Sequence, residues 1–146
     1  MNVKIKKIHP EAKVPVYGSA GAACFDLYAA SIISTESETE RTVVYGTGLQ
    51  FEVPEGHVMM IYSRSGHGFK HGITLANSTG VIDADYRGEV MVKLTKRDTS
   101  VYGMPAVGER IAQAMIIPVE QVVFDEVDEL SDTKRGAGGF GSTGVK

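Results

Sequence analysis

Apolar residues recur along this chain with a period of two, in short runs that Gly, Pro, Asn or Asp closes. In one such run, Val90, Val92 and Leu94 alternate with more polar neighbours. This alternation turns one face of a strand toward a core, whereas a surface helix repeats about every 3.6 residues. The expected strands are 3–5, 25–28, 42–45, 49–53, 57–63, 90–95, 111–119 and 122–127.

Many short strands with frequent turns predict an all-β barrel or sandwich, with at most one short helical turn near Ser65–Phe69. The Ser-, Thr- and Glu-rich stretch 31–41 is interpreted as an exposed loop or hairpin tip. Residues 1–130 are expected to form one β-barrel domain. Residues 131–146 are expected to form a flexible, glycine-rich C-terminal arm.

Length and charge exclude several classes of protein. A chain of 146 residues suits one domain, and a net charge of −3 argues against an indiscriminate nucleic-acid binder. Cys24 is the single cysteine, so we expect a buried or neutral free thiol and no disulfide. We expect no signal peptide, membrane span or membrane partner. The expected location is the cytoplasm, or a nucleus or organelle for a eukaryotic or viral source.

The glycine-rich arm carries Arg135 and Phe140. Glycine loses much backbone entropy on ordering, so an aromatic ring in such a segment suggests that the arm orders over a ligand. The ring can stack and Arg135 can pair with a phosphate. The arm is not read as a P-loop, because Ser142 stands in place of the lysine of that motif and no helix-forming segment follows it. The alternative is a disordered, solvated tail.

Two segments indicate phosphate binding. Ser63-Arg64-Ser65-Gly66 ends an apolar strand, and its guanidinium can bind a phosphate in a bidentate manner while Gly66 lets the backbone approach. Gln113 lies among apolar residues, where a buried amide needs a partner. The alternatives are a surface turn for the first segment and a structural amide for the second.

The richest segment is Asn77–Gly88, which is interpreted as a hairpin bordering an exposed edge whose backbone groups can read a base. Asp83 follows two β-branched residues, so we expect it at the mouth of an apolar pocket, where it can act as a general base. The alternative for Asp83 is an ordinary turn aspartate. Tyr86 is equally compatible with a core position.

A carboxylate and two histidines complete the candidates. Asp26 lies inside an apolar strand, where it needs either a hydrated cation or a basic residue as partner. His67 and His71 have the spacing of a helical metal pair. The glycines around them disfavour a helix, so a zinc site is not expected.

Five segments together resemble the five motifs of the homotrimeric deoxyuridine triphosphatases, in the family's order. They are 21–27, 54–66, 80–88, 108–113 and 135–144. The resemblance implies a jelly-roll-like β-barrel subunit and a homotrimer with shared active sites, each closed by an arm from a neighbouring subunit. It implies hydrolysis of dUTP to dUMP and pyrophosphate, which lowers dUTP and supplies dUMP for dTMP synthesis.

The resemblance also implies residue roles. Asp83 would activate the water that attacks the α-phosphate, Tyr86 would pack against the deoxyribose, and Phe140 would stack over uracil. Mg²⁺ would be held mainly by the triphosphate, with Asp26 assisting through water. The implied substrate-binding residues are Arg64, Ser65, Gly66, Asn77, Gly80, Val81, Ile82, Tyr86, Met91, Gln113, Arg135, Phe140, Gly141 and Ser142.

The sequence departs from the family pattern at His67-Gly68, where Leu-Ala is more common. This puts the packing beside the phosphate-binding turn in question. One alternative is dCTP deaminase, which shares the fold, but Lys93 stands where its catalytic glutamate would lie. Another is a regulatory binding protein that uses the nucleotide as a switch.

Overall fold

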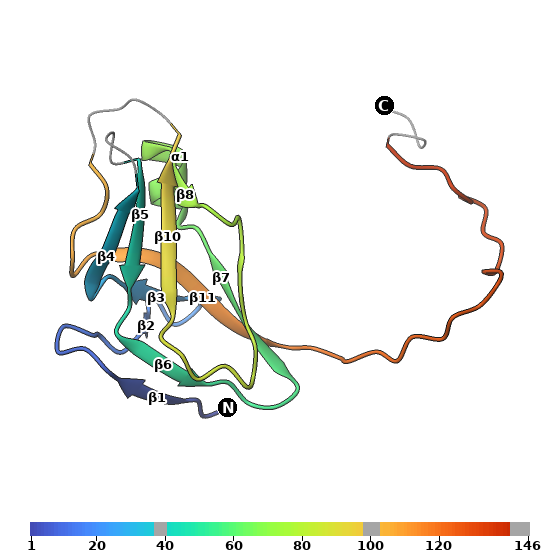
Figure 1. Ribbon diagram of the computed structural model, residues 1–146, viewed down its shortest axis with the longest axis horizontal. Coiled ribbons are helices and arrows are strands. Elements are labelled where there is room, and N and C mark those ends of the chain that lie inside the picture. Colours follow the sequence, from blue (N-terminus) through green and yellow to red (C-terminus); the bar gives the residue numbers. More distant parts are fainter. Residues whose placement is uncertain (37–40, 98–102, 141–146) are drawn as a thin grey trace.

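The computed structural model describes residues 1–36, 41–97 and 103–140, and these form three antiparallel sheets and one helix (Figure 1). In spatial order, the five-stranded sheet contains β2 (Val16–Tyr17), β3 (Phe25–Tyr28), β11 (Arg110–Pro118), β7 (His57–Tyr62) and β9 (Gly80–Ile82). The four-stranded sheet contains β4 (Ser31–Glu36), β5 (Thr42–Gly46), β10 (Met91–Lys96) and β8 (Ile73–Leu75). The third sheet pairs β1 (Lys4–Lys7) with β6 (Leu49–Glu52).

The order of strands within the two larger sheets gives the fold its class. In both, neighbouring strands are mostly not consecutive in the sequence, so the chain crosses repeatedly from one sheet to the other. Such crossing connections between two antiparallel sheets are typical of a jelly roll. The predicted all-β, jelly-roll-like class is confirmed.

The core lies between the two larger sheets. Leu27 and Ile111 from one sheet and Tyr45 and Leu94 from the other are at most 1% exposed. The alternation predicted for 90–95 is confirmed, because Val90, Val92 and Leu94 are all buried while Met91 is exposed. Full burial of side chains of this kind stabilises the fold by about 1.5–3 kcal/mol each.

The helix α1 (Ser65–His71) follows β7 directly and is longer than the predicted turn. It ends at Gly72, whose left-handed backbone (φ 61°) is the usual glycine conformation after a helix. Its position between β7 and β8 places α1 at the end of the molecule opposite β1 (Figure 1). No helix in the described ranges is long and apolar enough to cross a membrane.

The prediction of a loop over 31–41 is wrong as far as Glu36. Residues 31–36 form β4, which pairs with β5 at the edge of the four-stranded sheet. Ile32, Ile33 and Thr35 favour a strand because they are β-branched. The polar composition reflects an exposed edge strand, and residues 37–40 lie outside the described part of the chain.

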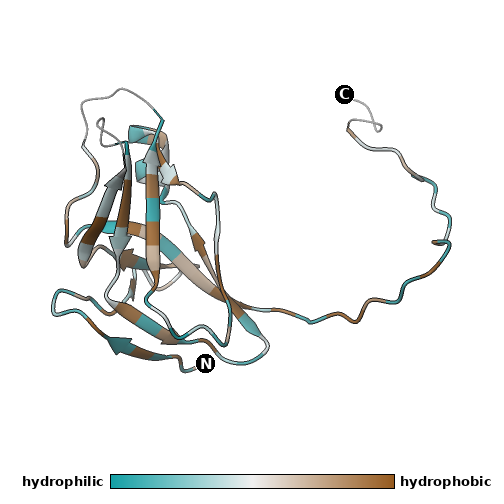
Figure 2. Ribbon diagram, in the orientation of Figure 1, coloured by the Kyte–Doolittle hydropathy of each residue, from teal (hydrophilic) through white to brown (hydrophobic). Residues whose placement is uncertain are grey.

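The predicted strand at 122–127 is also wrong. After Pro118 the chain runs away from the body, and residues 119–140 carry no strand or helix (Figure 1). Val123 and Phe124 are 91% and 89% exposed, and Figure 2 shows such hydrophobic stretches along this extension. A strand needs a neighbour for its backbone groups. This segment has none among the described residues of its own chain.

The segment 77–88 is not a hairpin. Its one strand, β9, pairs with β7, whereas the preceding β8 pairs with β10 in the other sheet. The turn after Leu75, with Ser78 at φ 63°, redirects the chain between the two sheets. The expectation of an exposed edge is correct, since β9 is the last strand of its sheet.

Candidate active site

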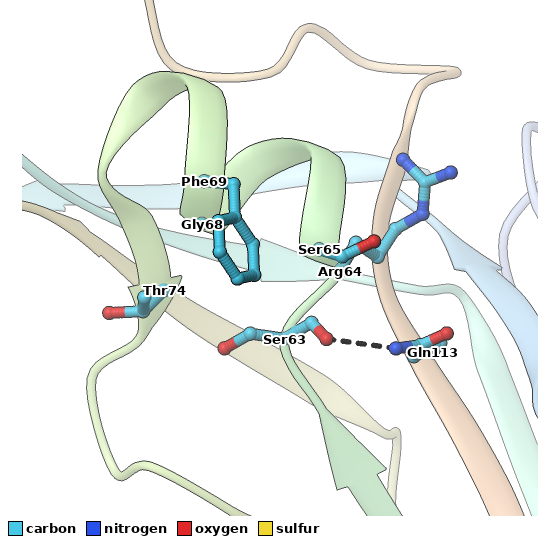
Figure 3. A pocket seen from close by; sticks show the side chains of 7 residues that line it. All are labelled: Ser63, Arg64, Ser65, Gly68, Phe69, Thr74 and Gln113. Carbon is cyan, nitrogen blue, oxygen red and sulfur yellow. Dashed lines mark hydrogen bonds between the residues drawn. The ribbon is translucent and has the colours of Figure 1, made fainter.

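A cavity of about 460 Å³ opens where β7 runs into α1 (Figure 3). Figure 3 shows the Phe69 ring on the side of Thr74 and the Arg64 guanidinium on the other side, next to the strand that carries Gln113. The cavity brings together three residues predicted to bind phosphate, namely Arg64, Ser65 and Gln113. It is lined by Ser63, Arg64, Ser65, Gly68, Phe69, Thr74 and Gln113.

Hydrogen bonds fix the turn that forms the cavity floor. Gln113 Nε2 donates to the Ser63 carbonyl at 3.0 Å, and the Leu75 amide donates to Ser63 Oγ at 2.9 Å. Gln113 is half-buried, so its amide meets the partner that burial requires. These bonds tie α1 and its preceding turn to both larger sheets. Next to Gly66 there is open space, so no contact with the described residues requires a glycine there.

Asp26 is the anchor of Arg64. The residue is only 9% exposed, and its Oδ1 accepts a hydrogen bond from Arg64 Nε at 3.0 Å. Its Oδ2 accepts a second bond from Arg110 Nη1 at 3.3 Å. Of the two predicted partners, a cation or a basic residue, the described contacts therefore supply the basic one. A buried carboxylate without such partners would be strongly unfavourable.

The loop after β9 carries Asp83 and Tyr86. Both are exposed, and neither lines the cavity. The described cavity lies at the other end of β7, so it is not the pocket at whose mouth Asp83 is expected, and that expectation stays a prediction. Tyr86 is not a core residue. Its hydroxyl donates to the Glu89 carbonyl at 2.9 Å, and its ring packs so closely on Gly88 that a Cβ there would collide with it.

Strand register separates Asp83 from the phosphate-binding turn. Ile82 pairs with Met59, so Asp83 lies level with Val58, five residues before Ser63. At about 3.3 Å per residue, this corresponds to roughly 17 Å along β7. Within one chain, the proposed base and the phosphate ligands therefore occupy opposite ends of this strand.

The remaining predicted residues are also dispersed. Val81 and Met91 are exposed on different sheets, and Asn77 Nδ2 donates to the Thr79 carbonyl in the turn before β9. Gly80 packs against Ile61, where an added Cβ would lie 3.0 Å from the Ile61 Cβ.

In the arm, Arg135 Nε donates to the Gly138 carbonyl at 2.7 Å, and Phe140 is fully exposed. The arm that carries them runs away from the body of its own chain (Figure 1). Gly141 and Ser142 lie outside the described residues.

Two titratable groups sit beside the site. Burial, followed by the charge of Arg64, lowers the pKa of His67, whose buried Nδ1 has no partner in the described structure. The helix that would align His67 with His71 does form, contrary to expectation. Within the described ranges, however, no three metal-binding side chains cluster. Burial, followed by the charge of Asp26, raises the pKa of Cys24, which favours the predicted neutral thiol.

Sequence reasoning assigned no site role to three residues of this region, namely Phe69, Thr74 and Arg110. Phe69 carries a usable signal, because an aromatic residue between glycines in a helical turn has no core to enter, and it is 94% exposed. Arg110 gives no such signal. Its contact with Asp26 depends on a shift in the register of β11 against β3, which cannot be predicted from the sequence.

Comparisons with known proteins agree with one another. The family model described as dUTPase matches residues 10–144. The deoxyuridine 5′-triphosphate nucleotidohydrolase of Nautilia profundicola is 48% identical over 144 residues, covering 99% of each chain. That of Wolinella succinogenes is 42% identical, covering 99% of this chain and 95% of its own. The dUTPase of Staphylococcus bacteriophage 80alpha with dUpNHpp matches with a TM-score of 0.82 and 27% identity over 99% of both chains. This chain belongs to the dUTPase family.

Proposed function

We propose that this protein hydrolyses dUTP to dUMP and pyrophosphate, which lowers dUTP and supplies dUMP for dTMP synthesis. Family membership supports the substrate. The observation that carries the proposal within the chain is the cavity where Arg64, Ser65 and Gln113 converge. The deaminase alternative has no support, because the relatives reported above are named as nucleotidohydrolases.

The phosphate-binding role follows from the geometry of this cavity. Arg64 donates a hydrogen bond to Asp26 through its Nε, which leaves the two terminal nitrogens of the guanidinium available for a phosphate. Ser65 supplies a hydroxyl, and the open space next to Gly66 lets phosphate oxygens approach the backbone. The Gln113 amide uses one N–H on Ser63 and keeps its second N–H for a ligand.

Asp83 is proposed as the general base that takes a proton from the attacking water. Its exposed position leaves it free to meet a substrate held partly by another subunit. Tyr86 is proposed to pack against the deoxyribose and to exclude a 2′-hydroxyl. Its ring is fixed for this purpose by the Glu89 carbonyl and by the absence of a side chain at Gly88. The backbone of β9, with Asn77, Gly80, Val81 and Ile82, is proposed to read uracil from the edge of the sheet.

The residues of the site are compatible with a magnesium ion that is bound mainly by the triphosphate. Mg²⁺ usually keeps several waters and binds through substrate phosphates, where it offsets their charge. The described residues contain no cluster of three metal-binding side chains, and both Asp26 oxygens already accept hydrogen bonds from arginine. The remaining lone pairs of Asp26 are sufficient to accept hydrogen bonds from water on the hydrated ion. This chain's own task is then to hold and orient the phosphates.

A homotrimer with shared sites is proposed as the working form. The separation of Asp83 from Arg64 along β7 supports it, because one chain alone does not join the two. The exposed apolar residues of 119–130 also support self-association. The arm, residues 131–146, is proposed to close a neighbouring site, with Arg135 on phosphates, Phe140 over uracil, and Gly141 and Ser142 beside them.

Pyrophosphate release from four nucleotides tests this proposal. The protein is incubated with Mg²⁺ and dUTP, dCTP, dTTP or UTP, and ammonia is assayed in parallel. We expect pyrophosphate from dUTP alone and no ammonia. Release of ammonia from dCTP would instead identify a deaminase. Nucleotide binding without turnover would favour the regulatory alternative.

A further inference from the structure

Arg110 has none of the roles proposed above, yet it contacts the carboxylate that holds Arg64. Its Nη1 lies 3.3 Å from Asp26 Oδ2, while Arg64 Nε lies 3.0 Å from Oδ1. One carboxylate therefore faces two guanidinium groups, and the cluster keeps a net positive charge. The Asp26 side chain is 13% exposed and that of Arg64 23%, so water screens their interaction only partly.

A β-bulge aims Arg110 at this carboxylate. In a regular strand, residues 110 and 113 would project from opposite faces, because side chains alternate. The register of β11 against β3 shifts between Arg110 and Ala112, and Ile111 and Ala112 are both fully buried on the core side. The extra residue returns Arg110 to the face that carries Gln113 and Asp26. Bulges next to active sites commonly re-aim a side chain in this way.

We propose that Arg110 is a positioning residue for the triphosphate: it neutralises Asp26, so that the charge of Arg64 remains available to the phosphates. Without Arg110, Asp26 and Arg64 form a neutral pair, and the attraction of the turn for an anion falls. The inference rests on the proposed function for the identity of the ligand. A purely structural Arg110 would affect the stability of the fold and leave phosphate affinity unchanged.

Arg110→Gln tests the proposal through the separation of KM from kcat. We expect KM for dUTP to rise about tenfold, with kcat within about threefold of the wild-type value, since the lost interaction acts on the bound phosphates. Arg110→Lys keeps the charge and should recover most of the affinity. Lys4→Gln, which removes one charge from the exposed Lys4–Glu52 pair far from the cavity, is the matched control and should leave KM unchanged. A wild-type KM in Arg110→Gln would overturn the proposal.

A double-mutant comparison isolates the route through Asp26. In an Asp26→Asn background there is no carboxylate charge to neutralise, so adding Arg110→Gln should leave KM unchanged. A further rise in KM would overturn the proposal. This comparison also decides the question if Arg110→Gln alone does not fold.

Pyrophosphate binding, measured by calorimetry on each variant, separates this inference from the proposed function. A wild-type protein that binds pyrophosphate but leaves dUTP intact would contradict the function. If pyrophosphate binding then weakens in Arg110→Gln, the inference about phosphate binding still holds. Equal binding in both proteins would overturn it.

Discussion

Buried polar side chains define the site at the scale of single residues. Asp26 is a buried carboxylate among the apolar side chains of β3, and its partners Arg64 and Arg110 come from positions 38 and 84 residues away. The burial of a carboxylate demands such partners, and the partners in turn fix where a phosphate can bind. The sequence predicts that Asp26 needs a partner. It does not predict which one, because that depends on contacts between distant strands.

Asp83→Asn should bind dUTP and barely hydrolyse it. The amide has nearly the same shape as the carboxylate but cannot take a proton from water, and the loss of a general base costs about 10²–10⁴-fold in rate. Single-turnover kinetics would measure the rate of the hydrolysis step, and calorimetry with dUpNHpp would measure binding. Turnover near the wild-type rate would exclude Asp83 as the base.

His67→Leu should reduce the loss of stability in mild acid. Burial lowers the pKa of His67 below its ordinary value of about 6.5, so the unfolded chain takes up the proton first as the pH falls. Its contribution to the free energy of unfolding is therefore intact above about pH 7 and is lost below about 6.5. Melting temperatures at about pH 7.5 and 5.5 should differ less in the variant than in the wild type. Equal differences would contradict this.

At the scale of elements, the sequence predicts strands correctly where apolar residues alternate. The prediction is wrong where a strand forms only if a neighbouring strand is available to pair with it. Strands β5, β6, β7, β10 and β11 follow from period two. The segment 122–127 has the same composition but no partner strand among the described residues of its chain. Similarly, the turn after Leu75 looks like part of a hairpin, although it carries the chain from one sheet to the other. The alternation of apolar and polar residues indicates which face of a strand is buried, but it does not indicate which strand lies next to it.

The loop between β9 and β10 gives a prediction about sugar selectivity. In Gly88→Ala the new methyl group would collide with the Tyr86 ring and displace it from the Glu89 carbonyl. The ratio of kcat/KM for dUTP to that for UTP should then fall, since Tyr86 no longer closes the space for a 2′-hydroxyl. Gly18→Ala, where an added Cβ meets open space, is the control. An unchanged ratio would remove Tyr86 from this role.

At the scale of the whole molecule, the arm carries Arg135 and Phe140, which are proposed to act in the active site of a neighbouring subunit. Removal of residues 131–146 should leave a folded trimer, because the residues of the buried core all lie between Ala12 and Ala114, before the arm. Activity should fall about 10²-fold, since Arg135 and Phe140 no longer position the substrate. Light scattering gives the oligomeric state and pyrophosphate release the rate. A fully active truncated protein would refute the role of the arm.

Subunit mixing tests whether sites are shared. Asp83 and the phosphate-binding turn lie roughly 17 Å apart along β7, so a site that uses both is expected to take them from different chains. Asp83→Asn and Arg64→Gln proteins, each nearly inactive, are unfolded together and refolded. If trimers assort at random, about a quarter of the sites combine an intact Asp83 with an intact Arg64, and activity should return to that fraction of the wild type. Each variant refolded alone is the control. If every chain instead carried its own complete site, each site in the mixture would keep one defect and no activity would return.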